Sequence, residues 1–375
     1  MLPGFLRIIQ PYRGRNRHTM DHHAYEQCLK EMFGLRRFGI KLGLDIIGNM
    51  LDGLGNPQHH FSCIHVAGTN GKGSIASALS AILHAAGYRV GLYTSPHLVR
   101  FNERICINNE PITDAGVVDA YEAVKSVYHG DREPTFFEYN TAMALYAFAN
   151  AGVEWAVIET GMGGRLDATN IIAPALSIVS NISMEHRSYL GDSIAEIAGE
   201  KGGIIKADTP VITGAKQKAA VEKLKHIAGK KSAPLYRLGE HFRIRRHRTN
   251  GIVDRFHYYG MDHTWKNMQS VLPGAHQADN SAVVLGACET LMRQNVALTD
   301  ESIQTGMANV CWPGRLEILP TRPEIVIDGA HNLTAARRLA DFLSDYTANR
   351  RLTIVIGILD DKPYPAMLRA LVPLA

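Results

Sequence analysis

The segment Cys63–Leu83 reads CIHVAGTNGKGSIASALSAIL and joins three different patterns. Its first five residues, Cys63–Ala67, form the short apolar run expected of a buried strand. The residues from Ser74 to Ala86 have the length and composition of a helix. The loop between them, Gly68–Ser74, holds three glycines and one lysine. This order of strand, glycine-rich loop and helix predicts a phosphate-binding loop at the edge of a parallel sheet.

The composition of this loop favours ATP as its ligand. Glycines let backbone amides approach phosphate oxygens, and the amino end of the following helix adds partial positive charge. A lysine supplies a full charge for the β- and γ-phosphates. The common G-x-x-x-x-G-K-[ST] form is altered, because Gly73 separates Lys72 from Ser74. The alternative is a glycine-rich turn with an incidental lysine. The predicted ATP-binding residues here are Gly68, Thr69, Asn70, Gly71, Lys72, Gly73 and Ser74.

Strand-like and helix-like segments alternate along most of the chain. The strand-like runs are short and apolar; they are Val90–Tyr93, Trp155–Ile158, Leu176–Asn181, Pro210–Thr213, Glu324–Ile327 and Leu352–Ile356. The other expected helices are Thr141–Ala151, Asp279–Met292 and Thr334–Tyr346. This alternation predicts an α/β fold with a doubly wound parallel sheet. At Phe242–Tyr259, two partly alternating arms about Asn250-Gly251 predict a β-hairpin.

Prolines and glycines between Trp312 and Pro323 mark an expected domain boundary. We expect an ATP-binding domain at residues 20–314 and a smaller, Rossmann-like α/β domain at residues 320–375. The second domain has so few elements before Ala375 that we expect it to be truncated. Residues 1–19 are basic and irregular, so they are interpreted as an extension, with Met20 as an alternative start.

The composition excludes several classes of protein. A net charge of only +4 does not call for a nucleic-acid partner, and no apolar run reaches the ~20 residues that cross a bilayer. No export signal is evident, so we expect a cytoplasmic location. The five cysteines are widely spaced and are expected to be small buried hydrophobic residues. The basic run at residues 216–248 is interpreted as a solvated helix face and hairpin, with attraction of acidic substrates as the alternative.

Nine ordered motifs carry a resemblance to a known family. They are HVAGTNGKGS, YTSPHLVRFNERICIN, FFEYNTAMALYAF, VIETGMGGRLDATN, NISMEHRSYLG, EKGGIIK, PGAHQADN, WPGRLE and VIDGAHN. Together they resemble the folylpolyglutamate synthase and dihydrofolate synthase branch of the Mur ligase superfamily. The resemblance implies a ligase that uses ATP to join L-glutamate to dihydropteroate or to a folate through an acyl phosphate. It further implies two Mg²⁺ ions, and we expect a monomer that binds only small molecules.

Four side chains are the expected catalytic and metal-binding groups. Ser95, Glu159 and His186 each follow a strand-like run, so they are expected to meet at the carboxyl edge of one sheet, where open α/β folds bind ligands. Oxygen donors suit Mg²⁺, and the resemblance supports the histidine. Lys201 resembles a lysine that the family carbamylates, which would let it bind a second Mg²⁺; the alternative is a helix lysine paired with Glu196 or Glu200. The predicted catalytic residues are Lys72, Glu159, His186 and Lys201.

The remaining site predictions come mainly from the resemblance. Asn280, Arg315 and Asp328 match the family's other ATP contacts. Six residues are expected on the substrate side: Phe101, Arg104, Phe136, Phe137, Tyr139 and His331. The aromatic side chains offer flat surfaces for a pterin ring, although aromatic residues in such a run are more often part of a core.

Two other functions stay open at this point. The first is a Mur-type ligase for a cell-wall precursor, although such relatives carry GKT or GKS after the glycines and an extra domain. The second is a truncated, non-catalytic nucleotide-binding protein. Glu185 departs from the aspartate that the family usually has before the histidine.

Overall fold

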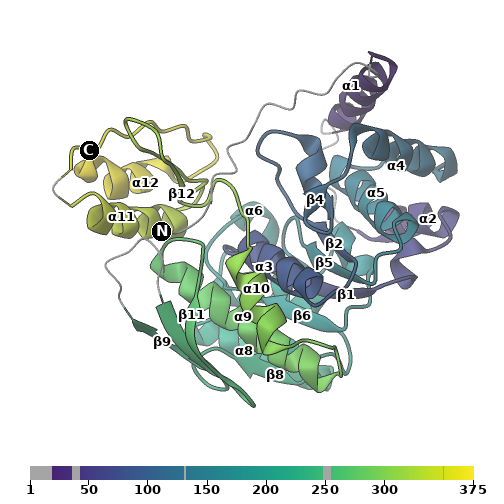
Figure 1. Cartoon of the computed structure of the whole chain (residues 1–375). Coiled ribbons are helices and arrows are strands. Elements are labelled where there is room, and N and C mark those ends of the chain that lie inside the picture. Colours follow the sequence, from purple (N-terminus) through teal and green to yellow (C-terminus); the bar gives the residue numbers. More distant parts are fainter. Residues whose placement is uncertain (1–18, 36–42, 131, 248–254, 349) are drawn as a thin grey trace.

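The computed structural model of the chain describes residues 19–35, 43–130, 132–247, 255–348 and 350–375, and a twisted sheet lies at its centre (Figure 1). The eight strands of this sheet lie in the order β4-β3-β2-β5-β1-β6-β7-β8. Their bounds are β1 Ser62–Ala67, β2 Val90–Tyr93, β3 Ile105–Ile107, β4 Glu110–Pro111, β5 Trp155–Glu159, β6 Leu176–Val179, β7 Val211–Thr213 and β8 Leu235–Arg237. In this order, each pair of neighbours from β2 through β5, β1, β6 and β7 to β8 is parallel. Strand β3 is antiparallel to both of its neighbours, β2 and β4.

The central strands are buried on both faces. In β5, Trp155 and Val157 pack into one apolar cluster, while Ala156 and Ile158 pack into another on the opposite face. Successive side chains of a strand point to opposite faces, so a strand covered on both sides reads as a continuous apolar run. The predicted doubly wound parallel sheet is confirmed.

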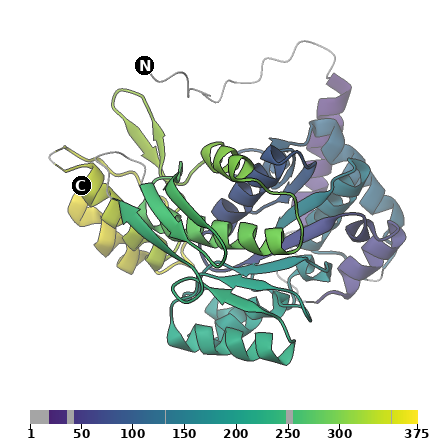
Figure 2. The same cartoon turned by 60° about the horizontal axis from the view of Figure 1, so that its bottom comes forward.

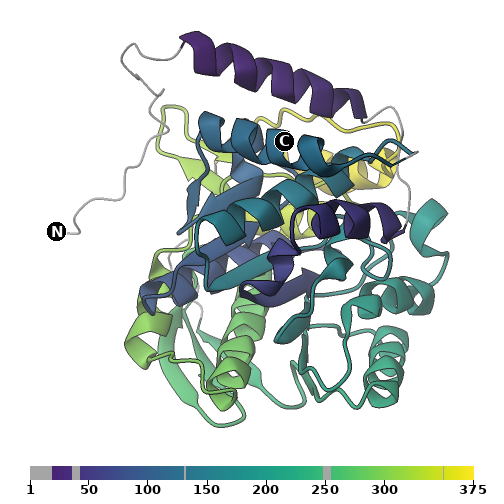
Figure 3. The ribbon, with the colours of Figure 1, turned by 90° about the vertical axis from the view of Figure 1, so that its right-hand side faces the viewer.

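Helices cover both faces of the sheet. One face carries α3 Lys72–Ala85, α9 Ala275–Arg293 and α10 Asp300–Ala308, and the other carries α1 Thr19–Gly34, α2 Asp45–Gly53, α4 Asp114–Val127 and α5 Phe136–Asn150. In Figure 3 the purple helix α1 lies along the outside of the blue helix α4. The short α6 Arg187–Leu190 leads into α7 Ile194–Lys201, which packs with α8 Lys218–Lys230 beside β7. No helix in the described ranges is long and apolar enough to cross a membrane.

A second, three-stranded antiparallel sheet packs on α9 (Figure 2). Its strands are β9 Arg243–His247, β10 Arg255–Tyr259 and β11 Thr264–Gln269. Pairing of β9 with β10 confirms the two arms of the predicted hairpin. The Asn250-Gly251 pair proposed as its turn lies outside the described residues.

The carboxyl-terminal part forms a small α/β unit of its own. It contains the antiparallel strands β12 Glu317–Leu319 and β13 Ile325–Ile327, and the helices α11 Leu333–Tyr346 and α12 Tyr364–Leu371. Its core is centred on Ala336, Leu343, Met367 and Leu371. The prediction of a strand at Leu352–Ile356 was wrong. In the described part of this unit β12 and β13 pair with each other, residues 352–356 pair with neither of them, and Val355 is 95% exposed.

Two further predictions need correction. Helix α5 begins at Phe136 and not at Thr141, because Thr135 caps it and Glu138 bonds back to the backbone N–H of Thr135. This reciprocal pairing is the T-x-x-E capping signature. Four cysteines are buried as predicted, whereas Cys311 is exposed, since it lies in the connection between α10 and β12.

Candidate functional site

A cavity of about 630 Å³ opens where the carboxyl edge of the central sheet meets the carboxyl-terminal unit. Residues from both parts of the chain line it. The predicted site residues on its wall are Thr69, Asn70, Gly71, Lys72, Gly73, Ser74, Ser95, Glu159, His186, Lys201, Asn280, Arg315, Asp328 and His331. The sequence patterns therefore identified groups that the fold brings together from positions as far apart as Thr69 and His331.

The phosphate loop connects β1 to α3 in the form that its glycines allow. Gly71 caps α3 with a φ of 82°, a left-handed conformation that favours glycine. A methyl group on Gly71 would also lie 2.6 Å from Oδ1 of Asn280, so α9 approaches the loop closely. Because α3 begins at Lys72, its free amide groups and its lysine face the same cavity. This arrangement suits a polyphosphate.

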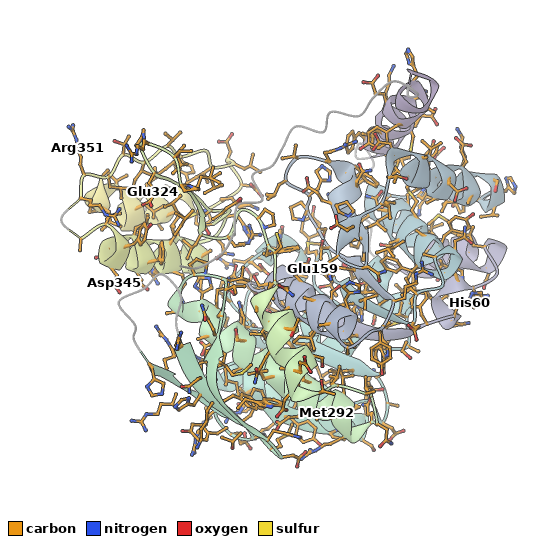
Figure 4. The ribbon with its side chains drawn as sticks, in the orientation of Figure 1. His60, Glu159, Met292, Glu324, Asp345 and Arg351 are labelled. Carbon is orange, nitrogen blue, oxygen red and sulfur yellow. The ribbon has the colours of Figure 1, made fainter. Side chains whose placement is uncertain are left out.

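Glu159, labelled in Figure 4, is the last residue of β5. Only 4% of it is exposed. Its Oε2 atom accepts a hydrogen bond from the backbone N–H of Ser95, and its Oε1 atom lies 3.8 Å from Nζ of Lys72. Burial raises the pKa of the Glu159 carboxyl, although the Lys72 ammonium acts in the opposite direction. A buried acid of this kind needs positive charge nearby, and a cation at the cavity would supply it.

Lys201 is 1% exposed and points back from the end of α7 toward the phosphate loop. Its ammonium donates to Oε1 of Glu185 at 2.6 Å and to the carbonyl oxygen of Gly68 at 2.9 Å. The alternative pairing with Glu196 or Glu200 was wrong. Their carboxylates serve other groups, the Ser193 cap of α7 and Arg165.

Burial lowers the pKa of Lys201 to about 8, and the Glu185 carboxylate opposes this change. Burial acts to raise the pKa of Glu185, but the charges of Lys201 and Lys72 and the hydrogen bond from Lys201 together lower it. Both groups are therefore ionised at neutral pH. They form a buried pair directly behind the phosphate loop.

His186 lies on the same cavity wall but not at the end of a strand. It precedes the short helix α6 with a left-handed φ of 44°. Burial lowers the pKa of His186, which favours the neutral ring that a metal would need. In the residues that the structure describes, no cluster of three or more His, Cys, Asp or Glu side chains is arranged to hold a metal ion. Any Mg²⁺ here would thus need further oxygen ligands from phosphate or water.

Arg315 and Asp328 face the cavity from the start of the carboxyl-terminal unit. The Asp328 carboxylate accepts hydrogen bonds from the backbone N–H groups of Leu316 and Ala330 at 3.0 and 2.9 Å. It thereby ties β12 to the loop after β13. Nδ1 of His331 donates to the carbonyl oxygen of Gly329, which leaves its other ring nitrogen available to the cavity.

Six predicted residues are not on the cavity wall: Gly68, Phe101, Arg104, Phe136, Phe137 and Tyr139. Tyr139 is buried in the core, where its hydroxyl donates to the carbonyl oxygen of Tyr121. Arg104 donates to Nδ1 of His97 and lies over the ring of Phe136. A pterin-binding role for these side chains stays a prediction.

Several cavity residues were missed by the sequence patterns. Gln277 donates from Nε2 to the Ser74 hydroxyl and accepts from Asn280 through Oε1, so it links α9 to the phosphate loop. His276 and Trp312 also line the cavity. The predicted helix began at Asp279 and did not include Gln277. In the structure α9 begins at Ala275, so Gln277, three residues before Asn280, shares its helix face. Trp312 begins the motif WPGRLE, but the motif by itself does not indicate that this side chain lines the cavity.

The fold and this site define a phosphate-loop enzyme whose nucleotide cavity is also lined by a second α/β unit. Residues 66–288 match the model of the Mur ligase middle domain, and residues 314–374 match the Mur ligase glutamate ligase domain. The dihydrofolate synthase/folylpolyglutamate synthase of Bacillus subtilis is 36% identical over 361 residues, which cover 94% of this chain and 84% of the relative.

Solved structures agree with this match. Folylpolyglutamate synthase from Thermotoga maritima has a TM-score of 0.84 and 37% identity, with 93% of this chain and 81% of that chain covered. An FPGS–AMPPCP–folate complex has a TM-score of 0.87 and 35% identity, with 93% and 87% covered. The chain belongs to the folylpolyglutamate synthase and dihydrofolate synthase family of the Mur ligase superfamily, and it is an ATP-dependent ligase. These relatives favour the folate branch over the cell-wall branch.

Proposed function

We propose that this chain joins L-glutamate to dihydropteroate, to a folate, or to both, by way of an acyl phosphate. The observation that carries the proposal is the single cavity that unites Lys72, Glu159 and Arg315. Lys72 and Arg315 supply positive charge for the phosphoryl group that is transferred, and Glu159 supplies a carboxylate beside them. The relatives that carry the folate names cover nearly the whole chain.

The proposed reaction has two steps. A carboxylate oxygen of the folate attacks the γ-phosphorus of ATP, and ADP leaves. The amine of glutamate then attacks the acyl carbon of the mixed anhydride, and inorganic phosphate leaves as the amide forms and the amine gives up a proton. Lys72 and Arg315 balance the charge on the phosphoryl oxygens, and the surrounding walls limit hydrolysis of the acyl phosphate by water.

Mg²⁺ suits the oxygen donors at this edge of the sheet. The carboxylate of Glu159 is buried and has one nearby ammonium, and Ser95 and His186 lie on the same wall. We propose these three residues as holders of the ion, which would neutralise phosphate charge when bound. Because Mg²⁺ keeps several waters and phosphate oxygens as ligands, few protein donors are needed.

A carbamylated Lys201 is the proposed holder of a second ion. Its lowered pKa, about 8, increases the fraction of free amine that CO₂ requires. A carbamate would place a second negative group beside Glu185, which only a cation would stabilise. We expect Lys201→Ala to lose activity and to regain part of it with added acetate or formate. Full activity of the variant would rule out this role.

A parallel acceptor assay tests the proposed function. The protein is given ATP, Mg²⁺ and glutamate with dihydropteroate, tetrahydrofolate or a cell-wall precursor, and phosphate release is measured. We expect release that depends on one or both pteridine acceptors and on glutamate. Release without any acceptor dependence would contradict ligase function. The same assay decides between the first and later glutamate additions, and sizing of the active protein tests the expected monomer.

A further inference from the structure

The extra glycine of the phosphate loop, Gly73, lies against the indole ring of Trp312. A methyl group on Gly73 would overlap Cζ2 of this ring and would lie 2.7 Å from Cε2. The two residues are 239 positions apart, and both line the nucleotide cavity. The indole therefore occupies the space in which any other residue at position 73 would place its side chain.

The backbone at Gly73 does not itself require glycine. The residue lies in the first turn of α3, and its φ is not in the left-handed region. Gly71 differs, since its φ of 82° and its contact with Asn280 both restrict the residue type. The three atoms nearest to a methyl group added at Gly73 all belong to Trp312, so the ring accounts for the glycine.

Trp312 belongs to the connection that leads from α10 to β12. The residue before it is also fixed to α3, because the Ser77 hydroxyl donates to the carbonyl oxygen of Cys311 at 3.0 Å. Three residues after Trp312, Arg315 faces the cavity, and its guanidinium donates to the carbonyl oxygen of Gly314. The connection is thus held on α3 immediately before the arginine that the reaction uses.

We propose that Trp312 is a positioning residue. Its indole ring fills the space beside Gly73, which fixes the connection between the two domains and so places Arg315 against the phosphates. Glycine at position 73 is needed because any side chain there would displace the ring. The departure from the common phosphate-loop pattern then serves alignment of the second domain as well as phosphate contact. This inference rests on the nucleotide site of the proposed function.

The test compares Gly73→Ala, Trp312→Ala and the double variant in the ligase assay and in binding of a non-hydrolysable ATP analogue. We expect Gly73→Ala to lower kcat about tenfold or more, because small misplacements of a positioning group are costly. Trp312→Ala removes the obstacle, so the double variant should match Trp312→Ala alone. Losses that multiply in the double variant would overturn the proposal, as would a fully active Gly73→Ala protein.

Matched controls separate positioning from folding. Gly71→Ala is strained by its own backbone, so adding Trp312→Ala should not reduce its loss. If Trp312→Ala does not fold, Trp312→Phe, which keeps a smaller ring, replaces it in the test. The double variant Gly73→Ala/Trp312→Phe should then have a higher kcat than Gly73→Ala. The KM for the folate should stay unchanged in every folded Trp312 variant, whereas a general loss of structure would alter it. Analogue binding by the unaltered protein without ligase activity would instead point to failure of the proposed function.

Discussion

The ammonium of Lys201 lies 2.6 Å from the carboxylate of Glu185, behind the phosphate loop. Only 2% of the lysine side chain and 9% of the glutamate side chain are exposed. The same ammonium donates to the carbonyl oxygen of Gly68, so the pair connects α7 to the first residue of the loop. Two charges are stable in such surroundings only while both are present.

Removal of one partner should therefore be costly. We expect Lys201→Met to lower the free energy of unfolding by about 3 kcal/mol, because Glu185 is then a buried charge without a cation. Urea unfolding measures this change. Lys201→Met/Glu185→Gln is the control and should recover a substantial part of the loss. Equal stability of Lys201→Met and the unaltered protein would show that the pair is not buried in solution.

Substitution of Glu159 tests the proposed metal site. Glu159→Gln keeps the size of the side chain but removes the carboxylate charge beside Lys72. We expect kcat to fall by about a hundredfold or more, and the Mg²⁺ concentration for half-maximal activity to rise. Titration of activity with Mg²⁺ gives both values. Glu200→Gln, at a carboxylate that pairs with Arg165, is the control and should change neither. An unchanged Mg²⁺ requirement in Glu159→Gln would remove this residue from the metal site.

A side-chain pair joins the phosphate loop to the carboxyl-terminal unit. Nδ2 of Asn332 donates to Oδ1 of Asn70 at 2.9 Å, while Oδ1 of Asn332 caps α11 by accepting from Ala335. Serine also caps helices but is too short to reach Asn70. In a double-mutant cycle of Asn70→Ala and Asn332→Ser, we expect a coupling of about 1 kcal/mol in the binding free energy of an ATP analogue. Additive effects would mean that the pair does not contribute in the nucleotide complex.

His276 should make stability depend on pH. Burial, together with the nearby Arg338 and Arg315 guanidinium groups and against the opposing effect of Asp279, lowers the pKa of His276 to about 4. The unfolded chain, with a pKa near 6.5, binds a proton that the folded chain resists, so stability falls as the pH drops from about 6.5 to about 4. We expect His276→Gln to show a shallower loss over this range in urea unfolding. Identical pH profiles would contradict the shift.

The sequence predicted the elements whose signals are local. Val90–Tyr93 is a strand with the predicted bounds, because an apolar run of this length suits a buried parallel strand. The phosphate loop could be predicted equally well, since its glycines and lysine lie within seven consecutive residues. Leu352–Ile356 has the same kind of apolar run but is not a strand in the structure. A strand requires a neighbour with which to pair, and the run itself carries no information about one.

Contacts between distant parts of the chain could not be predicted from local sequence patterns. Helix spacing gave Lys201 the wrong partner, because its true partner Glu185 precedes α7 and approaches from the loop after β6. The role of Gly73 depends in the same way on Trp312, which only the folded chain brings near. The family resemblance predicted many of the residues that line the cavity, but it did not show which of them touch one another.

Transfer of an isotope label tests the central claim most directly. The acceptor carboxylate is labelled with ¹⁸O, the reaction is run with ATP, Mg²⁺ and glutamate, and the released phosphate is analysed by mass spectrometry. An acyl phosphate keeps one carboxylate oxygen in the bond to phosphorus, so we expect one ¹⁸O in each phosphate and the other in the amide. Unlabelled phosphate released during amide formation would contradict the acyl phosphate route, and no amide with either pteridine acceptor would contradict the assigned activity.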